Sequence, residues 1–235
     1  MKKYLFLLGL LFSVTALPAQ QTIQSHNVHG FTVINLTGNL FVELLPAESN
    51  SIDIVLTDSD LNKLKWEVDA GVLSVTLRPT QGRGVKAKAD VKIYYCPSTS
   101  PLNLISLTEG ELYISEPLQS PMLNITLTGG AKISAAIDAF DLEADVSGNS
   151  VASLSGEAKY LTLRATEKSK VDTRKLDSVS ATVDAATGAE VFVRASERLA
   201  ANAKSAAAIY YMGEPTILKS RANVGMGASV HNIDY

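Results

Sequence analysis

The chain has 235 residues, 46% of them hydrophobic and 19% charged, so it is long enough for one or two domains and apolar enough to bury a substantial core. Its formal net charge of −3 gives no basic footprint of the kind that binds nucleic acid. A single cysteine excludes a disulfide framework and a cysteine zinc cluster, and three histidines leave little material for a histidine site. The sequence therefore predicts no metal, no cofactor and no nucleic-acid partner.

Residues 1–19 have the features of a secretory signal peptide. Lys2 and Lys3 supply the positive start, residues 4–17 are mostly apolar, and Ala19 is a small residue at the expected cleavage point. This stretch is shorter than the ~20 apolar residues of a membrane helix, and no later segment is apolar enough to span. We expect an exported chain without an integral membrane span, located in the periplasm or on the cell surface.

Residues 20–100 form a first part in which apolar and polar side chains alternate. Such alternation predicts β-strands at residues 31–42, 52–56, 64–77 and 89–96. The sequence Asp69-Ala70-Gly71 predicts a hairpin turn, and Cys96 is expected to be a small core residue. We expect this β-rich part to continue into the following segment and to cap one of its ends.

Residues 101–235 contain an internal repeat, the strongest signal in the chain. A four-residue unit recurs as ELYI, GAKI, GNSV, KSKV, GAEV, AAAI and GASV, which closes at Ile114, Ile133, Val151, Val171, Val191, Ile209 and Val230. The spacings are 19, 18, 20, 20, 18 and 21 residues, a period of about 19. Because alternating, strand-like sequence fills each period, we expect one coil of a parallel β-helix per repeat, with coils ~4.8 Å apart.

The repeat also predicts which side chains face the core. Residues two apart in a strand share a face, so the closing Ile/Val residue and the residue two before it should point inward. That second inward set is Leu112, Ala131, Asn149, Ser169, Ala189, Ala207 and Ala228. The residues between them should point outward: Tyr113, Lys132, Ser150, Lys170, Glu190, Ala208 and Ser229.

Two details of the repeat can be checked directly. Lys170 and Glu190 should lie on adjacent coils, where their charges can pair. Glycine opens most of the units, which predicts a turn with positive φ. Glu111, Lys168 and Ala206 stand at the glycine position, so their coils must turn differently or accept strain.

The chain resembles a bacterial family called "putative auto-transporter adhesin, head GIN domain" over about residues 28–230. The resemblance is carried by HGFTVINLTGNLFVELLPAESNSIDIVLTDSDLNKLKWEVDAGVLSVTL, KADVKIYYC, the glycine repeats and IYYMGEPTILKSRANVGMGASV. It implies an all-β, right-handed parallel β-helix at the surface of a bacterium, typically one of the Bacteroidetes. It brings no catalytic residues to transfer, and a shared fold does not establish a function.

A polysaccharide-acting enzyme would need acids gathered in one groove. Asp138, Asp141, Glu143 and Asp145 form the densest acidic run, and the last three alternate along one strand face. We prefer the simpler interpretation that they are the solvent face of a strand whose inward side begins at Phe140. The sequence contains no serine elbow and no histidine metal motif, so we predict no catalytic residues.

Two features are candidates for ligand binding. The basic loop RPTQGRGVKAK is suited to an anionic polysaccharide or a lipopolysaccharide, although such loops are more often flexible, soluble hairpins. Its candidate residues are Arg78, Arg83, Lys86 and Lys88. In the Tyr210–Tyr211 pair one ring should face outward, where Tyr211 would stack on a sugar; core packing or subunit contact is the alternative. The sequence around Ser178 also matches a short O-glycosylation pattern.

We therefore expect a secreted, non-enzymatic β-helical protein that presents a surface to a glycan or to a cell-surface protein, as an adhesin does. The alternative is a structural or assembly protein of the cell envelope, which would form homo-oligomers through the open ends of the solenoid. An enzyme that acts on polysaccharide is the third interpretation.

Overall fold

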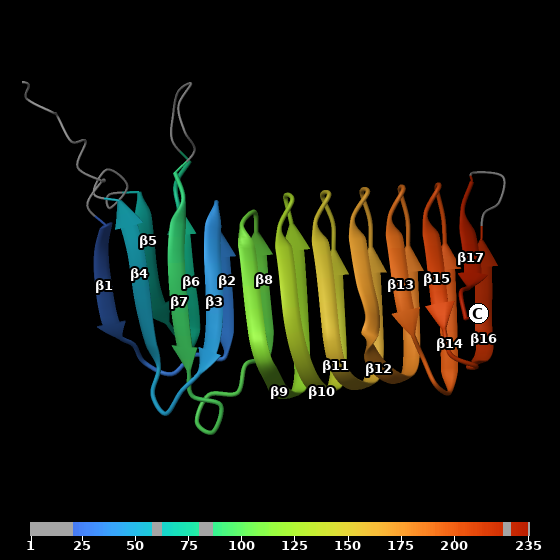
Figure 1. The fold of residues 1–235 in the computed structure, drawn as a ribbon, viewed down its shortest axis with the longest axis horizontal. Helices are drawn as coiled ribbons and strands as arrows, with labels where there is room; N and C mark the ends of the chain where they lie inside the picture. Colours follow the sequence, from blue (N-terminus) through green and yellow to red (C-terminus); the bar gives the residue numbers. More distant parts are fainter. Residues whose placement is uncertain (1–20, 58–62, 80–86, 223–226, 235) are drawn as a thin grey trace, which may run out of the picture.

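The computed structural model describes residues 21–57, 63–79, 87–222 and 227–234. Their regular structure is entirely β, wound into a solenoid of about six turns, which confirms the expected parallel β-helix (Figure 1). Within these ranges no helix has the length and apolar character that crossing a membrane would require. The expected signal peptide, residues 1–19, lies outside the described residues.

The coils are flattened, so the strands lie in two layers that face each other across the core (Figure 1). The first layer contains β1 (Gln21–Asn27), β3 (Leu40–Pro46), β4 (Ser51–Thr57), β7 (Ala89–Tyr95), β13 (Glu190–Arg194), β15 (Ala208–Met212) and β17 (Ser229–Asn232). The second layer contains β2 (Val33–Thr37), β5 (Leu64–Asp69), β6 (Val72–Leu77), β8 (Leu104–Thr108), β14 (Arg198–Ala203) and β16 (Thr216–Ala222). Four long strands bend and serve both layers: β9 (Glu111–Thr128), β10 (Lys132–Val146), β11 (Val151–Ala165) and β12 (Lys170–Ala185).

Tight turns join the second layer to the first along one edge of the solenoid, the turn edge, at the top of Figure 1. From the β8–β9 turn to the β14–β15 turn, two successive residues have positive φ, as in Gly148 (67°) and Asn149 (61°), which is the pattern of a type I′ turn. The predicted positive-φ turn is therefore confirmed. Lys168 and Ala206 adopt φ values of 59° and 62°, so these coils keep the same turn and accept the strain.

The strand register corrects the repeat at two coils. Ile133 lies between Leu112 and Ala152, not between Ile114 and Val151, so the true column is Leu112, Ile133, Ala152, Val171, Val191, Ile209 and Val230. The predicted alignment of the GNSV unit was therefore wrong by one residue. Because side chains alternate between the two faces of a strand, this error exchanges the predicted inward and outward residues of that unit. Ser150 is buried, whereas Asn149 and Val151 are exposed. At the other coils the predicted inward positions are confirmed, with Val230 at the last coil half-buried.

The opposite edge, where the long strands bend, also departs from simple alternation. We call it the bend edge; it lies at the bottom of Figure 1. Ala139 and Leu142 are both buried, so the two residues between them face outward. Phe140 is 54% exposed, and the expectation that it points inward was wrong because the bend interrupts the two-residue period.

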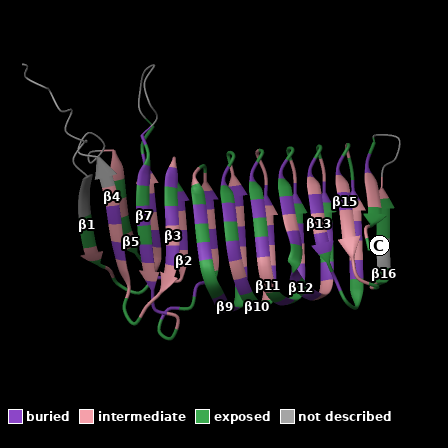
Figure 2. Cartoon of the chain, in the orientation of Figure 1, coloured by how far each residue is buried: buried purple, intermediate pink, exposed green. Residues whose placement is uncertain are grey.

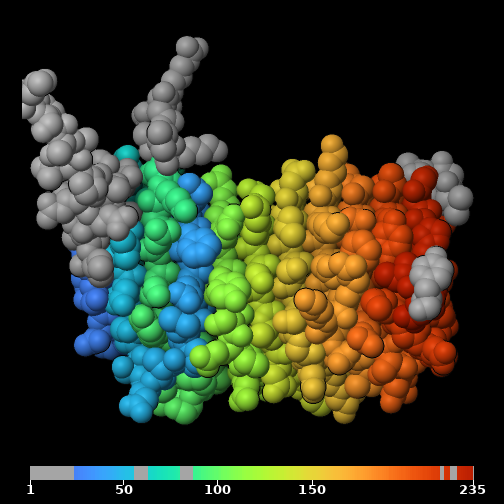
Figure 3. All heavy atoms as spheres, in the orientation of Figure 1, coloured from blue at the N-terminus to red at the C-terminus, as the bar shows by residue number. Residues whose placement is uncertain are grey.

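The N-terminal half is not stacked in sequence order. The coil made by β2 and β3 pairs on one side with β6 and β7 and on the other with β8 and β9, all in parallel. Figure 3 shows the result as a blue band between green bands. Beyond β6 and β7, the strands β4, β1 and β5 pair antiparallel and form the expected β-rich cap. The predicted hairpin turn is confirmed between β5 and β6, with positive φ at Ala70 and Gly71.

The core is one continuous apolar cluster between the two layers, and buried and exposed residues alternate along nearly every strand (Figure 2). It contains the inward columns of the repeat and extends into the cap, where Trp66 covers it. Cys96 is buried, as expected.

A matched pair of serines tests the corrected register. Ser150 Oγ is buried without a hydrogen-bond partner, whereas Ser169, next in the column, donates to the carbonyl of Val146 at 2.9 Å. Ser150→Ala should raise the free energy of unfolding by ~1 kcal/mol because it removes an unsatisfied hydroxyl, and Ser169→Ala should lower it by a similar amount. Urea unfolding of both variants checks this; a loss of stability in Ser150→Ala would contradict the register.

Gly156 tests the backbone of the bend. Its φ is 107°, and a Cβ there would lie 2.1 Å from the carbonyl oxygen of Ile137 on the neighbouring coil. Gly156→Ala should therefore cost several kcal/mol, because the backbone must shift. Gly130→Ala is the control: its φ is 82° but its surroundings are open, so only about 1 kcal/mol of strain is expected. If urea unfolding shows that the two variants lose the same amount of stability, the predicted collision with Ile137 is contradicted.

Candidate functional site

A depression runs along the bend edge, roughly parallel to the solenoid axis. We call it the bend-edge groove; it has a volume of about 750 Å³ and crosses β10, β11 and β12 before it reaches the residues that follow β13 and β15. Its charged and aromatic lining consists of Asp138, Phe140, Glu157, Lys159, Asp177, Arg194 and Glu214. It exists because three long strands bend at the same place in successive coils.

A row of carboxylates follows the groove. Asp138 pairs in register with Glu157, and Glu157 with Asp177, so one acid stands on each of three successive coils, ~4.8 Å apart. At the end of the row Asp177 Oδ1 lies 3.3 Å from Arg194 Nε. The row offers acceptors for hydroxyl or ammonium hydrogens along the length of the groove.

Phe140 lines the groove and packs against Tyr160, which lies outside the lining. The rings of Phe140 and Tyr160 meet edge to face with centroids 5.3 Å apart, and Tyr160 is 41% exposed. The ammonium group of Lys159 lies 4.9 Å from the Phe140 centroid and 5.5 Å from that of Tyr160. Two large aromatic rings thus make cation–π contacts with the same lysine at the surface, beside a row of hydrogen-bond acceptors.

Hydrogen bonds fix the floor of the groove. Ser178 is 3% exposed and its hydroxyl donates to the carbonyl of Arg194, while the Ser196 hydroxyl donates to the carbonyl of Ser178 at 3.2 Å. The folded chain therefore does not present the Ser178 hydroxyl that the glycosylation pattern singled out.

The acidic run on β10 is arranged as a solvent face. Asp141, Glu143 and Asp145 are half-buried, and Arg164 on the next coil pairs with Glu143 and lies 3.5 Å from Asp145. Arg164 is thus a basic partner for two of the three acids, which fits the preferred interpretation that these acids form the solvent face of a strand. Across the described ranges no three His, Cys, Asp or Glu residues are grouped so that they could hold a metal ion.

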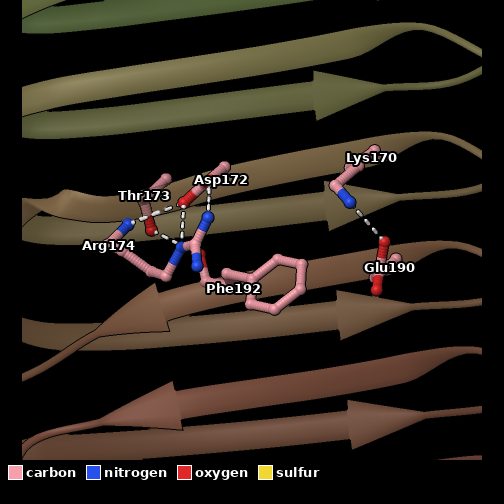
Figure 4. A network of polar contacts seen from close by, with 6 residues as sticks. All are labelled: Lys170, Asp172, Thr173, Arg174, Glu190 and Phe192. Carbon is pink, nitrogen blue, oxygen red and sulfur yellow. Dashed lines mark hydrogen bonds and ion pairs between the residues drawn. The ribbon is translucent and has the colours of Figure 1, made fainter.

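A second arrangement lies on the outer face of the first layer (Figure 4). Arg174 donates from Nε and Nη2 to the two oxygens of Asp172, at 2.9 and 2.5 Å, and its guanidinium carbon lies 4.7 Å from the centroid of Phe192. Lys170 lies over the same ring at 5.2 Å and pairs with Glu190 at 2.8 Å, which confirms the predicted pair. The hydrogen bonds from Arg174 lower the pKa of Asp172.

The Phe192 ring begins an aromatic stack that continues toward the C-terminal end. Its centroid is 4.9 Å from that of Tyr210, which in turn is 5.9 Å from that of His231. The rings cover one another's faces and present mainly edges to solvent, so the stack joins coils rather than offering a flat platform to a sugar. The stack was not predicted from the sequence, although its three residues recur at about the repeat period.

The candidate residues chosen from the sequence lie in separate places. Arg78 and Lys88 are exposed in the N-terminal half, where Lys88 is 3.9 Å from Asp90. Arg83 and Lys86 lie outside the described residues. Tyr211 is on β15, near the other end of the solenoid, and packs against the core, so the outward ring of its pair is Tyr210 (Figure 1).

The family described as "Putative auto-transporter adhesin, head GIN domain" matches residues 30–215. The chain belongs to this family. The resemblance read from the sequence is therefore confirmed for most of the chain. No curated protein sequence matches this head GIN domain protein.

Solved structures share its fold. A "putative adhesin" from Bacteroides fragilis NCTC 9343 has a TM-score of 0.81 at 18% identity and covers 92% of this chain and 98% of its own. A "putative adhesin" from Parabacteroides merdae ATCC 43184 has a TM-score of 0.65 at 14% identity and covers 92% of this chain and 97% of its own. A "putative lipid binding protein" from Parabacteroides distasonis ATCC 8503 has a TM-score of 0.68 at 16% identity and covers 91% of this chain and 97% of its own. At such identities the likeness shows the fold alone.

The Asp172–Arg174 pair predicts a pH dependence for this head GIN domain protein. Because the folded pKa of Asp172 is lowered, the pair stabilises the fold above the ordinary carboxyl pKa of about 4, and this contribution is lost as the pH falls through the folded pKa. Asp172→Asn should lower the free energy of unfolding by ~1 kcal/mol at pH 7 and by progressively less below about pH 4. The measurement is urea unfolding across that range.

The control for this prediction is the same substitution in an Arg174→Gln background, where the hydrogen bonds that lower the pKa are gone. There the effect of Asp172→Asn should no longer change with pH in this way. A difference between wild type and Asp172→Asn that stays constant from pH 7 to pH 2 would contradict the assignment.

Proposed function

We propose that this protein is an exported, non-enzymatic adhesin that binds a glycan along the bend-edge groove. One observation carries the proposal: a groove of about 750 Å³ that crosses several coils has the half-exposed Phe140 ring at its rim. Membership of the adhesin family supports surface binding in general. The site and the class of ligand are inferred from the chemistry of the groove.

A sugar ring combines an apolar C–H face with a rim of hydroxyl groups. The Phe140 and Tyr160 rings provide exposed apolar surface for the first, and the carboxylates beside them accept hydrogen bonds from the second. Specific sites generally pair an apolar lining with a few placed polar groups. Because the groove follows the solenoid axis, its shape suits an extended chain of sugars better than a compact molecule.

The charge of the groove further restricts the class of glycan that it can bind. Four carboxylates and two cations line it, so its local charge is negative. A neutral glycan or one with amino groups is therefore favoured over a strongly anionic polysaccharide. The basic residues Arg78, Arg83, Lys86 and Lys88 would suit an anionic glycan instead, and they are the alternative binding site for the same function.

Phe140→Ala tests the proposal. The chain without residues 1–19, clustered to amplify weak single-site binding, would be screened on a glycan array, and the affinity for the best glycan measured by calorimetry. Loss of the exposed ring should weaken binding about tenfold or more, as expected for an aromatic contact at a binding site. Circular dichroism would show that the variant is folded.

Phe41→Ala is the matched control. Phe41 is 42% exposed and also has a lysine over its ring, Lys88 at 5.7 Å, but it lies far from the groove on β3. Its loss should leave the affinity unchanged. Equal affinity of wild type and Phe140→Ala would contradict the groove as the site, and loss of binding in Arg78→Ala and Lys88→Ala would move it to the basic residues.

A further inference from the structure

A second hollow lies on the outer face of the first layer, beside the bend edge. We call it the serine trough; it has a volume of about 560 Å³ and crosses β10, β11 and β12. Its polar lining consists of Ser134, Ser153, Ser155, Asp172, Arg174 and Lys175. Two cations and one carboxylate give the trough a positive local charge, whereas that of the bend-edge groove is negative, and the two hollows share no lining residue.

A β-bulge on β12 presents the two cations in succession. The register between β11 and β12 shifts by one residue at this point, so that Thr173 and Arg174 together oppose one residue of β11. Thr173 takes the inward position, where its hydroxyl donates to the carbonyl of Phe192 at 2.9 Å. Arg174 and Lys175 are therefore both exposed on the outer face. Bulges redirect side chains in this way and are common beside functional sites.

One of these cations is held in place, and the other has no acid. Asp172 accepts the hydrogen bonds of Arg174 Nε and Nη2, which fix the guanidinium and leave its remaining N–H groups for a ligand (Figure 4). On the other side of the pair, Asp177 Oδ1 lies 3.3 Å from Arg194 Nε. Within the described ranges Lys175 makes no ion pair. Because the neighbouring acids of β12 are engaged, Lys175 is a surplus positive charge at the trough.

Serine hydroxyls form the floor of the trough beside the cations. Ser134 and Ser153 are exposed and paired in register, so their side chains stand on adjacent coils ~4.8 Å apart. Neither hydroxyl forms a hydrogen bond with another residue of the described ranges. Ser155 donates to the carbonyl of Ala135 at 3.3 Å, which leaves its oxygen able to accept. The floor therefore offers both donors and acceptors to the hydroxyl groups of a ligand.

We propose that the serine trough binds a sugar acid, with its carboxylate against Arg174 and Lys175 and its hydroxyl groups over the serines. A planar guanidinium matches a carboxylate, and hydrogen bonds between charged groups are about twice as strong as neutral ones. A volume of about 560 Å³ is far larger than a carboxylate needs and is typical of sites for small molecules. The site is distinct from the bend-edge groove and does not depend on the function proposed there.

Titration with three probes tests the proposal. Glucuronic acid, glucose and acetate would be added at low salt to the ¹⁵N-labelled chain without residues 1–19, and the amide NMR signals of the trough followed. Glucuronic acid should shift these signals saturably. Glucose and acetate should each bind about tenfold more weakly or less, because glucose lacks the carboxylate and acetate lacks the hydroxyl groups.

Two variants separate the cation from the floor. Lys175→Ala should raise the dissociation constant for glucuronic acid about tenfold, because it removes the unpaired charge. Ser153→Val should raise it by a similar factor and leave the binding of acetate unchanged, because it replaces a hydroxyl of the floor with an apolar side chain that suits a strand.

Lys204→Ala is the matched control, because it also removes one exposed positive charge but lies at the turn edge, between β14 and β15. It should leave the affinity unchanged, as should Phe140→Ala in the bend-edge groove. The proposal would be overturned by the absence of saturable binding, by equal affinity for acetate, or by equal effects of Lys175→Ala and Lys204→Ala. Weakening by Phe140→Ala without an effect of Lys175→Ala would also overturn it, by moving the sugar acid to the groove.

Discussion

Hydrogen bonding of each coil to the next, in register, is the constraint on which the rest of this structure depends. Type I′ turns such as Gly148–Asn149 hold the coils to nearly equal length, so the same position recurs on neighbouring coils. Side chains are therefore arranged in rows along the axis. The core columns, the carboxylate row of the groove and the aromatic stack are all products of this arrangement. A glycine is needed at position 156 because a Cβ there would collide with the carbonyl oxygen of Ile137 on the neighbouring coil.

Much of the fold can be predicted from the sequence because individual residues of a given kind recur at the repeat period. Apolar residues recur about every 19 positions, and the Lys170–Glu190 pair follows from counting alone. The frame at GNSV could not be fixed in this way, because Asn149 and Ser150 are both small and polar and only the register shows which is inside. The placement of the β2–β3 coil between two later coils is a long-range pairing that no local pattern records.

The candidate site was harder to predict for a related reason. Asp138, Glu157 and Asp177 are 19 and 20 residues apart and form no motif; they become a row only when the coils are aligned. Phe140 was assigned to the core because alternation continued through it, and the bend that exposes it depends on neighbouring coils that bend at the same place. The basic loop, by contrast, is conspicuous in the sequence because its residues are adjacent.

The central claim is that the bend-edge groove is where this head GIN domain protein meets its glycan. The most direct test is a crystal structure of the chain with the best oligosaccharide from the array screen. The account predicts sugar density along the groove, with one ring against Phe140 and hydroxyl groups within hydrogen-bond distance of Glu157 or Asp177. Density at Arg78 and Lys88, or on the aromatic stack beside Tyr210, with an empty groove would contradict it.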